Sequence, residues 1–148
     1  MITRELVEAA LFKMGMSASL KGFGYIVDSV LTMNKEKNIK ITYLYFRVAK
    51  IYGTTAQRVE RSIRHAFETV RGCKGDYDVV NHYIGFANCT NSASLSMLLL
   101  RLREEIKKKE NYSVSLETTQ DITEERFLEL MRQSQKEFLK EIMNRLKM

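Results

Sequence analysis

Three arginines and a histidine recur in the stretch 54–68, and these residue types bind phosphates and the edges of bases. Arg58, Arg61, Arg64 and His65 all fall away from the apolar positions of the stretch. An arginine guanidinium presents a planar fork of donors that fits a phosphate, or guanine O6 and N7, with two hydrogen bonds. The spacing therefore predicts one basic surface suited to an anionic ligand with readable edges, such as a nucleic acid.

The elements that must position these side chains are two helices joined by a short turn. Apolar residues of the stretch recur at helical spacing and predict one buried face. They are Val59, Ile63, Phe67 and Val70. Thr54 followed three positions later by Gln57 predicts a capping box, and Gly53 can adopt a left-handed turn. With a preceding helix at about 40–52, the pattern predicts a helix-turn-helix whose recognition helix covers about 55–71.

Different side chains of this helix suit different contacts with DNA. Arg58 and Arg61 stand near the helix start, which points into the groove, so we expect them to read base edges. Arg64 and His65 are expected on phosphates, although a surface position without a ligand is equally open for His65. Glu60 either accepts from a cytosine N4 amine or forms a salt bridge with Arg64, four residues further along.

The chain is expected to be all-α, a multi-helix bundle that contains the helix-turn-helix and adds a further helix at the C-terminus. It has no proline among 148 residues, and proline is excluded from helix interiors. No strand-like alternation persists. We expect helices at about 3–14, 19–34, 40–52, 55–71, 76–83, 92–109 and 122–147.

Three segments are predicted along the chain. Residues 1–110 are expected to form the helix-turn-helix domain, 111–121 a polar linker and 122–148 an amphipathic helix. The apolar positions of that helix fit one broad stripe. They are Phe127, Leu128, Met131, Phe138, Ile142 and Leu146. A helix that folds back to complete the core is the favoured interpretation. The alternative is a dimerisation helix, in which Gln135 falls where a heptad requires an apolar residue.

The charge distribution favours an anionic partner for the first half of the chain. The net charge is +6, yet residues 1–75 hold 13 Lys or Arg against 6 Asp or Glu, and residues 76–148 hold 11 against 12. A basic half that contains a recognition helix favours double-stranded DNA over a membrane. The other interpretation, that these charges only maintain solubility, is equally compatible with charge alone.

Other classes of function find little support in the sequence. No Gly-rich phosphate loop or nucleophile motif occurs, and Cys73, Cys89, His65 and His82 fit no metal-ligand spacing, so we expect no enzyme, metal or cofactor. The longest apolar run, near 97–100, is too short to cross a bilayer, and no signal peptide is apparent. A cytoplasmic protein without membrane contact is therefore expected.

Long, irregular motifs in the sequence resemble those of a known family. They are LYFRVAKIYGTTAQRVERSIRHAFE at 44–68, MGMSASLKGFGYI at 14–26, IGF at 84–86 and TNS at 90–92. They run in order between about Leu6 and about Lys107. This region resembles the DNA-binding effector domain of the master regulator of endospore formation, stage-zero sporulation protein A. The resemblance implies a sequence-specific, double-stranded DNA-binding transcription regulator.

The resemblance also implies roles for particular residues, because family members bind a short box with a guanine and a cytosine near its middle. The matching helix positions are Gln57, Arg58, Glu60, Arg61, Arg64 and His65. Gln57 replaces a small hydroxyl residue of the family. Thr54 and Thr55 are expected either on phosphate or as caps alone. Arg47 replaces an acidic residue and is expected on the DNA backbone.

Further expectations concern partners and control. Family members contact the polymerase sigma subunit and pair on tandem boxes, which implies a sigma contact near 72–86 and a homodimer on DNA. The family's receiver domain does not precede the match, so we expect no control by the protein's own phosphorylation unless the chain is a fragment. The alternative function is a protein-interaction module or antagonist, which would bind a full-length regulator, a sigma factor or a kinase through the C-terminal helix.

Overall fold

The computed structural model describes residues 1–120 and 124–147, with the side chains of 73–74 and 116–120 left aside. The described chain contains helices and no strand, which confirms the all-α prediction. The elements are α1 (Arg4–Lys13), α2 (Lys21–Lys35), α3 (Ile41–Tyr52), α4 (Ala56–Thr69), the π-helical turn η1 (Val70–Lys74), α5 (Tyr77–Tyr83), α6 (Asn91–Gln120) and α7 (Glu124–Leu146). They divide into two compact units, residues 1–107 and 108–148.

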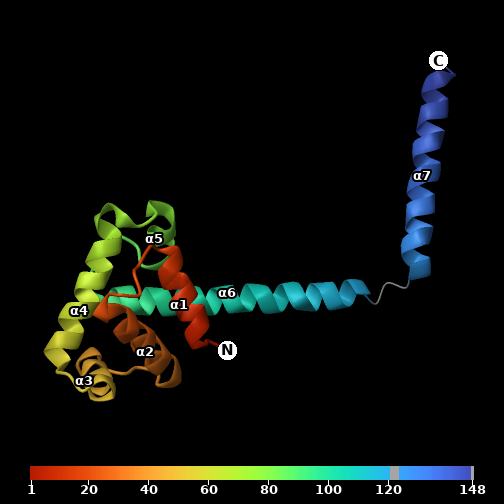
Figure 1. Cartoon of the computed structure of the whole chain (residues 1–148). Helices are drawn as coiled ribbons and strands as arrows, with labels where there is room; N and C mark the ends of the chain where they lie inside the picture. Colours follow the sequence, from red (N-terminus) through yellow and green to blue (C-terminus); the bar gives the residue numbers. More distant parts are fainter. Residues whose placement is uncertain (121–123, 148) are drawn as a thin grey trace. The chain divides into compact units, whose positions relative to one another are not determined.

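One apolar core holds the first unit together. Figure 1 shows α1 to α5 gathered about the first part of α6. Each of these six helices contributes at least one side chain that is at most 1% exposed. Examples in chain order are Leu11, Ile26, Leu44, Ile63, Val80 and Leu98. Because the recognition helix α4 supplies part of this core, its position is fixed by the same burial that stabilises the unit.

The turn between α3 and α4 follows the prediction at Gly53 and departs from it at the next residue. Gly53 adopts the expected left-handed conformation, with φ 61° and ψ 39°. The capping residue is Thr55, whose hydroxyl accepts from the N–H of Arg58 at 3.3 Å. The prediction of Thr54 as the cap is wrong, because the Thr54 N–H still bonds the Ala49 carbonyl of α3 at 3.0 Å. The recognition helix therefore begins at Ala56.

Close packing of α2 against α4 depends on Gly22, the glycine of the LKG motif. A Cβ at this position would lie 2.2 Å from the Ser62 carbonyl oxygen and 2.8 Å from the Ala66 Cβ, both on α4. Only a residue without a side chain fits this approach. The motif thus sets how near α2 and α4 come to each other.

The recognition helix α4 ends at Thr69, close to the expected end at about 71, but the chain does not break there. The chain continues as η1 through Lys74, and the turn comes at Gly75. A Cβ on Gly75 would lie 2.3 Å from the Met14 carbonyl oxygen, so the end of η1 is pressed against the end of α1. Gly72 meets nothing within 4 Å and does not interrupt the turn.

The C-terminal region differs from expectation in where its helices end. Helix α6 continues to Gln120, beyond the end expected near 109. The segment 111–120, predicted as a linker, contains neither Pro nor Gly that would stop a helix. Residues 121–123 and 148 of the predicted linker and final helix lie outside the described residues. No residue of α7 is buried. The domain division, the fold-back and the dimerisation helix stay predictions.

Candidate nucleic-acid interface

Helix α4 buries one face in the core of the first unit. The predicted stripe is confirmed, since Val59, Ile63 and Phe67 are at most 1% exposed and Val70, in η1, is 2% exposed. Burial of these side chains holds the opposite face of the helix toward solvent. The side chains of Gln57, Arg58, Arg61, Arg64 and His65 all lie on the exposed side.

The flank of α4 nearest α2 is basic and open. Among the side chains that the structure describes, those of Arg58 and Arg61 make no hydrogen bond or ion pair. Arg61 and His65 share a surface hollow of about 290 Å³ with Lys21 at the start of α2. Sequence reasoning assigned Lys21 no role. The LKG motif that contains Lys21 can be recognised in the sequence. Only the contact between Gly22 and α4 brings this lysine beside the recognition helix.

The other flank of α4 is electrically compensated. Arg64 forms an ion pair with Glu60 one turn earlier, which is one of the two roles predicted for Glu60. Glu68 lies one turn after Arg64. Together with Arg64 and Glu60 it lines a hollow of about 560 Å³ that α4 forms with α3 and the start of α6. An exposed pair of this kind contributes only about 0.3–0.5 kcal/mol. The two flanks therefore differ in charge, and the basic one faces α2.

The remaining predicted contact residues lie at the turn and on α3. Thr54 is half-buried and Thr55 is exposed, and the Thr55 hydroxyl serves as the helix cap. A hydroxyl that accepts one hydrogen bond can still donate another. Arg47 pairs with Glu36 and lies over the Tyr43 ring, 6.0 Å from its centroid. Arg47 is thus held between Tyr43 of its own helix and Glu36 at the end of α2.

The TNS motif anchors the recognition helix to α6. The Asn91 side-chain amide donates to the Glu60 carbonyl oxygen at 3.0 Å. The Thr90 hydroxyl accepts from the Ala93 N–H at 3.3 Å and so caps the start of α6. The motif therefore couples the beginning of one helix to the middle of another.

Arg71, in η1 just after α4, also connects the recognition helix to α6. Its Nε donates to the Gly85 carbonyl at 2.9 Å, and its Nη2 donates to the Ser94 hydroxyl at 2.7 Å and to the Ile84 carbonyl at 3.3 Å. All three acceptors are neutral oxygens, and burial lowers the pKa of Arg71. The guanidinium also lies over the Phe67 ring, 5.9 Å from its centroid. One side chain thereby joins η1, the IGF turn and α6.

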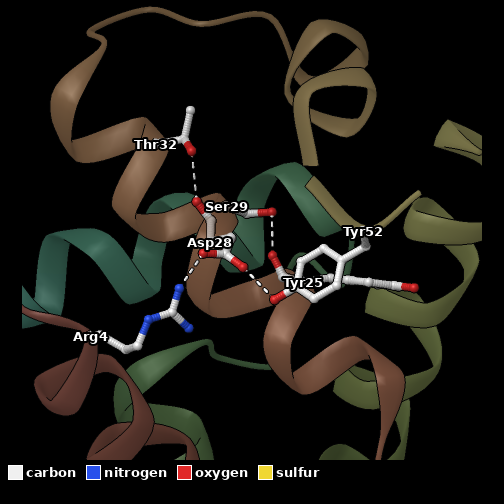
Figure 2. A network of polar contacts seen from close by, with 6 residues as sticks. All are labelled: Arg4, Tyr25, Asp28, Ser29, Thr32 and Tyr52. Carbon is white, nitrogen blue, oxygen red and sulfur yellow. Dashed lines mark hydrogen bonds and ion pairs between the residues drawn. The ribbon is translucent and has the colours of Figure 1, made fainter. Parts of the chain in front are cut away.

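A third polar network fixes the end of α3, just before the turn (Figure 2). The Asp28 carboxylate of α2 accepts from the Tyr52 hydroxyl and, at 2.5 Å, from the Arg4 guanidinium of α1. Burial, together with the hydrogen bond to Asp28, raises the pKa of Tyr52 to about 12. Asp28 therefore ties α1 and α3 to α2, and it does so at the last turn of α3, which leads directly into the turn of the helix-turn-helix.

An all-α domain that presents the exposed arginines of the second helix of a helix-turn-helix has the architecture of a DNA-binding protein. Comparison with known families agrees. Residues 7–102 match the family model "Sporulation initiation factor Spo0A C terminal", and the chain belongs to this family. The family's domain binds DNA, regulates transcription and is non-catalytic. Within 1–120 and 124–147, no helix has an apolar stretch long enough for a membrane span.

Proposed function

We propose that this protein is a sequence-specific regulator of transcription that places α4 in the major groove of double-stranded DNA. The observation that carries the proposal is the contrast between the two sides of α4. One side is buried, and the other presents Arg58 and Arg61, whose side chains make no described hydrogen bond or ion pair. Guanidinium groups held outward on a fixed helix are preorganised for base edges.

The proposed contacts divide into base reading and phosphate binding. Base edges are read by Gln57, Arg58, Glu60 and Arg61. Phosphates are bound by Thr54, Thr55, Arg64, His65 and Arg47, and we add Lys21 because it lines a hollow with Arg61 and His65. The exposed ion pairs of Arg64 and Arg47 do not oppose this role, since a phosphate replaces a carboxylate that contributes little.

The test is a titration of fluorescent duplexes with the whole protein. One duplex carries the family's box, with a guanine and a cytosine near its middle, and the other carries the same bases scrambled. Specific reading predicts tighter binding to the box, and phosphate contact predicts that affinity for both falls steeply as salt rises. Equal affinity for the two duplexes at every salt concentration would count against sequence reading.

Two variants assign the effect to α4. Arg61→Ala is expected to lose about 1–3 kcal/mol of discrimination between the duplexes, the worth of one bidentate base contact. Arg103→Ala removes the same charge from α6, where Arg103 donates to Asn34, and is expected to keep the discrimination. The sigma contact and independence from phosphorylation stay predictions that this titration does not address.

A further inference from the structure

Helix α7 lies outside the family match and exposes an apolar surface. Nine large apolar side chains of this helix are exposed, between 38% for Ile142 and 80% for Leu146. Seven of them lie on one side of the helix at 100° per residue, and the polar residue Gln135 lies on the same side. We call this surface the α7 stripe; it comprises Phe127, Leu128, Met131, Phe138, Leu139, Ile142 and Leu146.

An apolar face of this length calls for a partner surface. A helix that stands alone in water gains little from backbone hydrogen bonds, and helices in proteins are stabilised mainly by packing of an amphipathic face. Contiguous exposed apolar patches on soluble proteins mark interaction sites. The remaining side of α7 is mainly charged and polar, with Gln133 near its centre, and also carries Leu130 and Met143. One long side of α7 is therefore suited to another helix.

Four apolar residues of the α7 stripe match one another when the direction of the helix is reversed. The midpoint of Glu124–Leu146 is Gln135. Reflection about this midpoint brings Leu128 to the level of Ile142 and Met131 to the level of Leu139. The polar residue within the stripe meets its own copy, and a glutamine amide can both donate and accept. A single buried polar pair of this kind fixes register and orientation.

Charge favours the same orientation. The first turn of α7 carries Glu124 and Glu125, whereas Arg145 lies in the last turn and Lys147 follows it. Two copies side by side in opposite directions place each acidic end next to a basic end, and their helix dipoles also oppose each other. Two parallel copies in register place like charges together at both ends.

We propose that α7 pairs with the α7 of a second copy of this chain, antiparallel and centred on Gln135. The occupant of the stripe is then this protein itself, in a symmetric contact in which both copies use the same surface. The pairing requires no DNA and does not rest on base reading by α4.

Sedimentation equilibrium of the full chain without DNA tests the pairing. The expected result is a reversible dimer of twice 17.3 kDa that dissociates on dilution. Phe138→Glu places a charge in the stripe and is expected to give a monomer, whereas Gln133→Glu places the same charge on the opposite side and is expected to give a dimer. A wild-type chain that stays monomeric at every concentration, or equal dimerisation of both variants, overturns the proposal.

Cross-linking tests the orientation, with both native cysteines first replaced by Cys73→Ser and Cys89→Ser. A Gln135→Cys chain is expected to form a disulfide-linked dimer under mild oxidation. A Leu128→Cys chain is not, because the two sulfurs lie 14 positions apart along the pair, about 21 Å. Efficient cross-linking of Leu128→Cys would show a parallel pair and overturn the antiparallel assignment.

Failure of the α7 pairing proposal can be distinguished from failure of the DNA-binding proposal. If Phe138→Glu is monomeric and still discriminates the box from the scrambled duplex, the first unit has kept its fold and both proposals stand. If the dimer forms but neither duplex is preferred, only base reading fails. Unfolding of the first unit in Phe138→Glu, measured by the loss of its cooperative thermal transition, would itself contradict the claim that the stripe serves a second copy.

Discussion

The Asn91 side-chain amide, at the start of α6, donates to the Glu60 carbonyl oxygen in the middle of the recognition helix at 3.0 Å. Asn91 is only 8% exposed, so its amide has little access to water. We expect Asn91→Ala to lower the free energy of unfolding by about 0.5–1.5 kcal/mol, the usual contribution of one hydrogen bond. Urea denaturation measures this change.

The matched control for this bond is its neighbour in the TNS motif. Ser92 is exposed, and Ser92→Ala is expected to change stability by no more than about 0.5 kcal/mol. If both variants unfold at the same urea concentration as the wild type, the bond from Asn91 contributes nothing to the position of α4.

Gly22 offers a second test of how α4 is positioned. Gly22→Ala places a methyl group 2.2 Å from the Ser62 carbonyl oxygen, which belongs to backbone and cannot rotate away. We expect a loss of about 1–3 kcal/mol in the free energy of unfolding, as for other overpacked cores. We also expect weaker binding to the box duplex, because α2 can no longer approach the basic flank of α4.

Gly72→Ala is the matched substitution in open space. Nothing lies within 4 Å of a Cβ at Gly72, and alanine there restricts the unfolded chain. The expected change is a gain of about 0.4–1 kcal/mol in stability, measured in the same urea titration. A loss at Gly72 as large as that at Gly22 would show that the close contact with Ser62 is not the cause.

Arg71 is expected to resist conservative replacement. Arg71→Lys keeps the charge but cannot reach Gly85, Ile84 and Ser94 together, because an ammonium group lacks the planar fork of a guanidinium. We expect both Arg71→Lys and Arg71→Ala to lose roughly 1.5–3 kcal/mol of unfolding free energy. Thermal melts of the two variants check this. Wild-type stability of Arg71→Lys would mean that charge alone is sufficient.

Much of the recognition helix could be predicted because local signals agree there. The stripe of Val59, Ile63 and Phe67 has a clear helical period, and Gly53 suits a left-handed turn. The choice between Thr54 and Thr55 as cap could not be predicted, because both are good caps. The bond from the Thr54 N–H to Ala49 decides it.

Other features depend on contacts between distant segments and leave little local signal. The turn η1 continues past Gly72, and its Arg71 bonds acceptors of α6 and the IGF turn that lie far along the chain. Lys21 joins the basic flank only because Gly22 lets α2 approach α4. No periodicity in the sequence indicates that the LKG motif and the recognition helix are neighbours in the fold.

Stability at alkaline pH should depend on Tyr52. Its pKa is raised to about 12 in the folded protein, from an ordinary value of 10.0. The folded state thus favours the protonated hydroxyl, and this stabilisation is complete below about pH 10 and is lost as the pH rises toward about 12. Urea titrations across this range should show a shallower decline for Tyr52→Phe than for the wild type. Parallel declines for the two proteins would exclude a contribution from Tyr52 ionisation.

Glu60→Gln should separate the two roles of Glu60 on DNA. The substitution releases Arg64 from its ion pair, so we expect tighter binding to both duplexes and a salt dependence steeper by about 0.9 in logarithmic slope, the worth of one new phosphate contact. If Glu60 also reads a cytosine, discrimination between the duplexes falls by about 1–3 kcal/mol. Glu68→Gln removes the same charge about two turns further along, where no described carboxylate–arginine pair is broken. Equal salt slopes for the two variants would mean that Arg64 does not reach the DNA backbone.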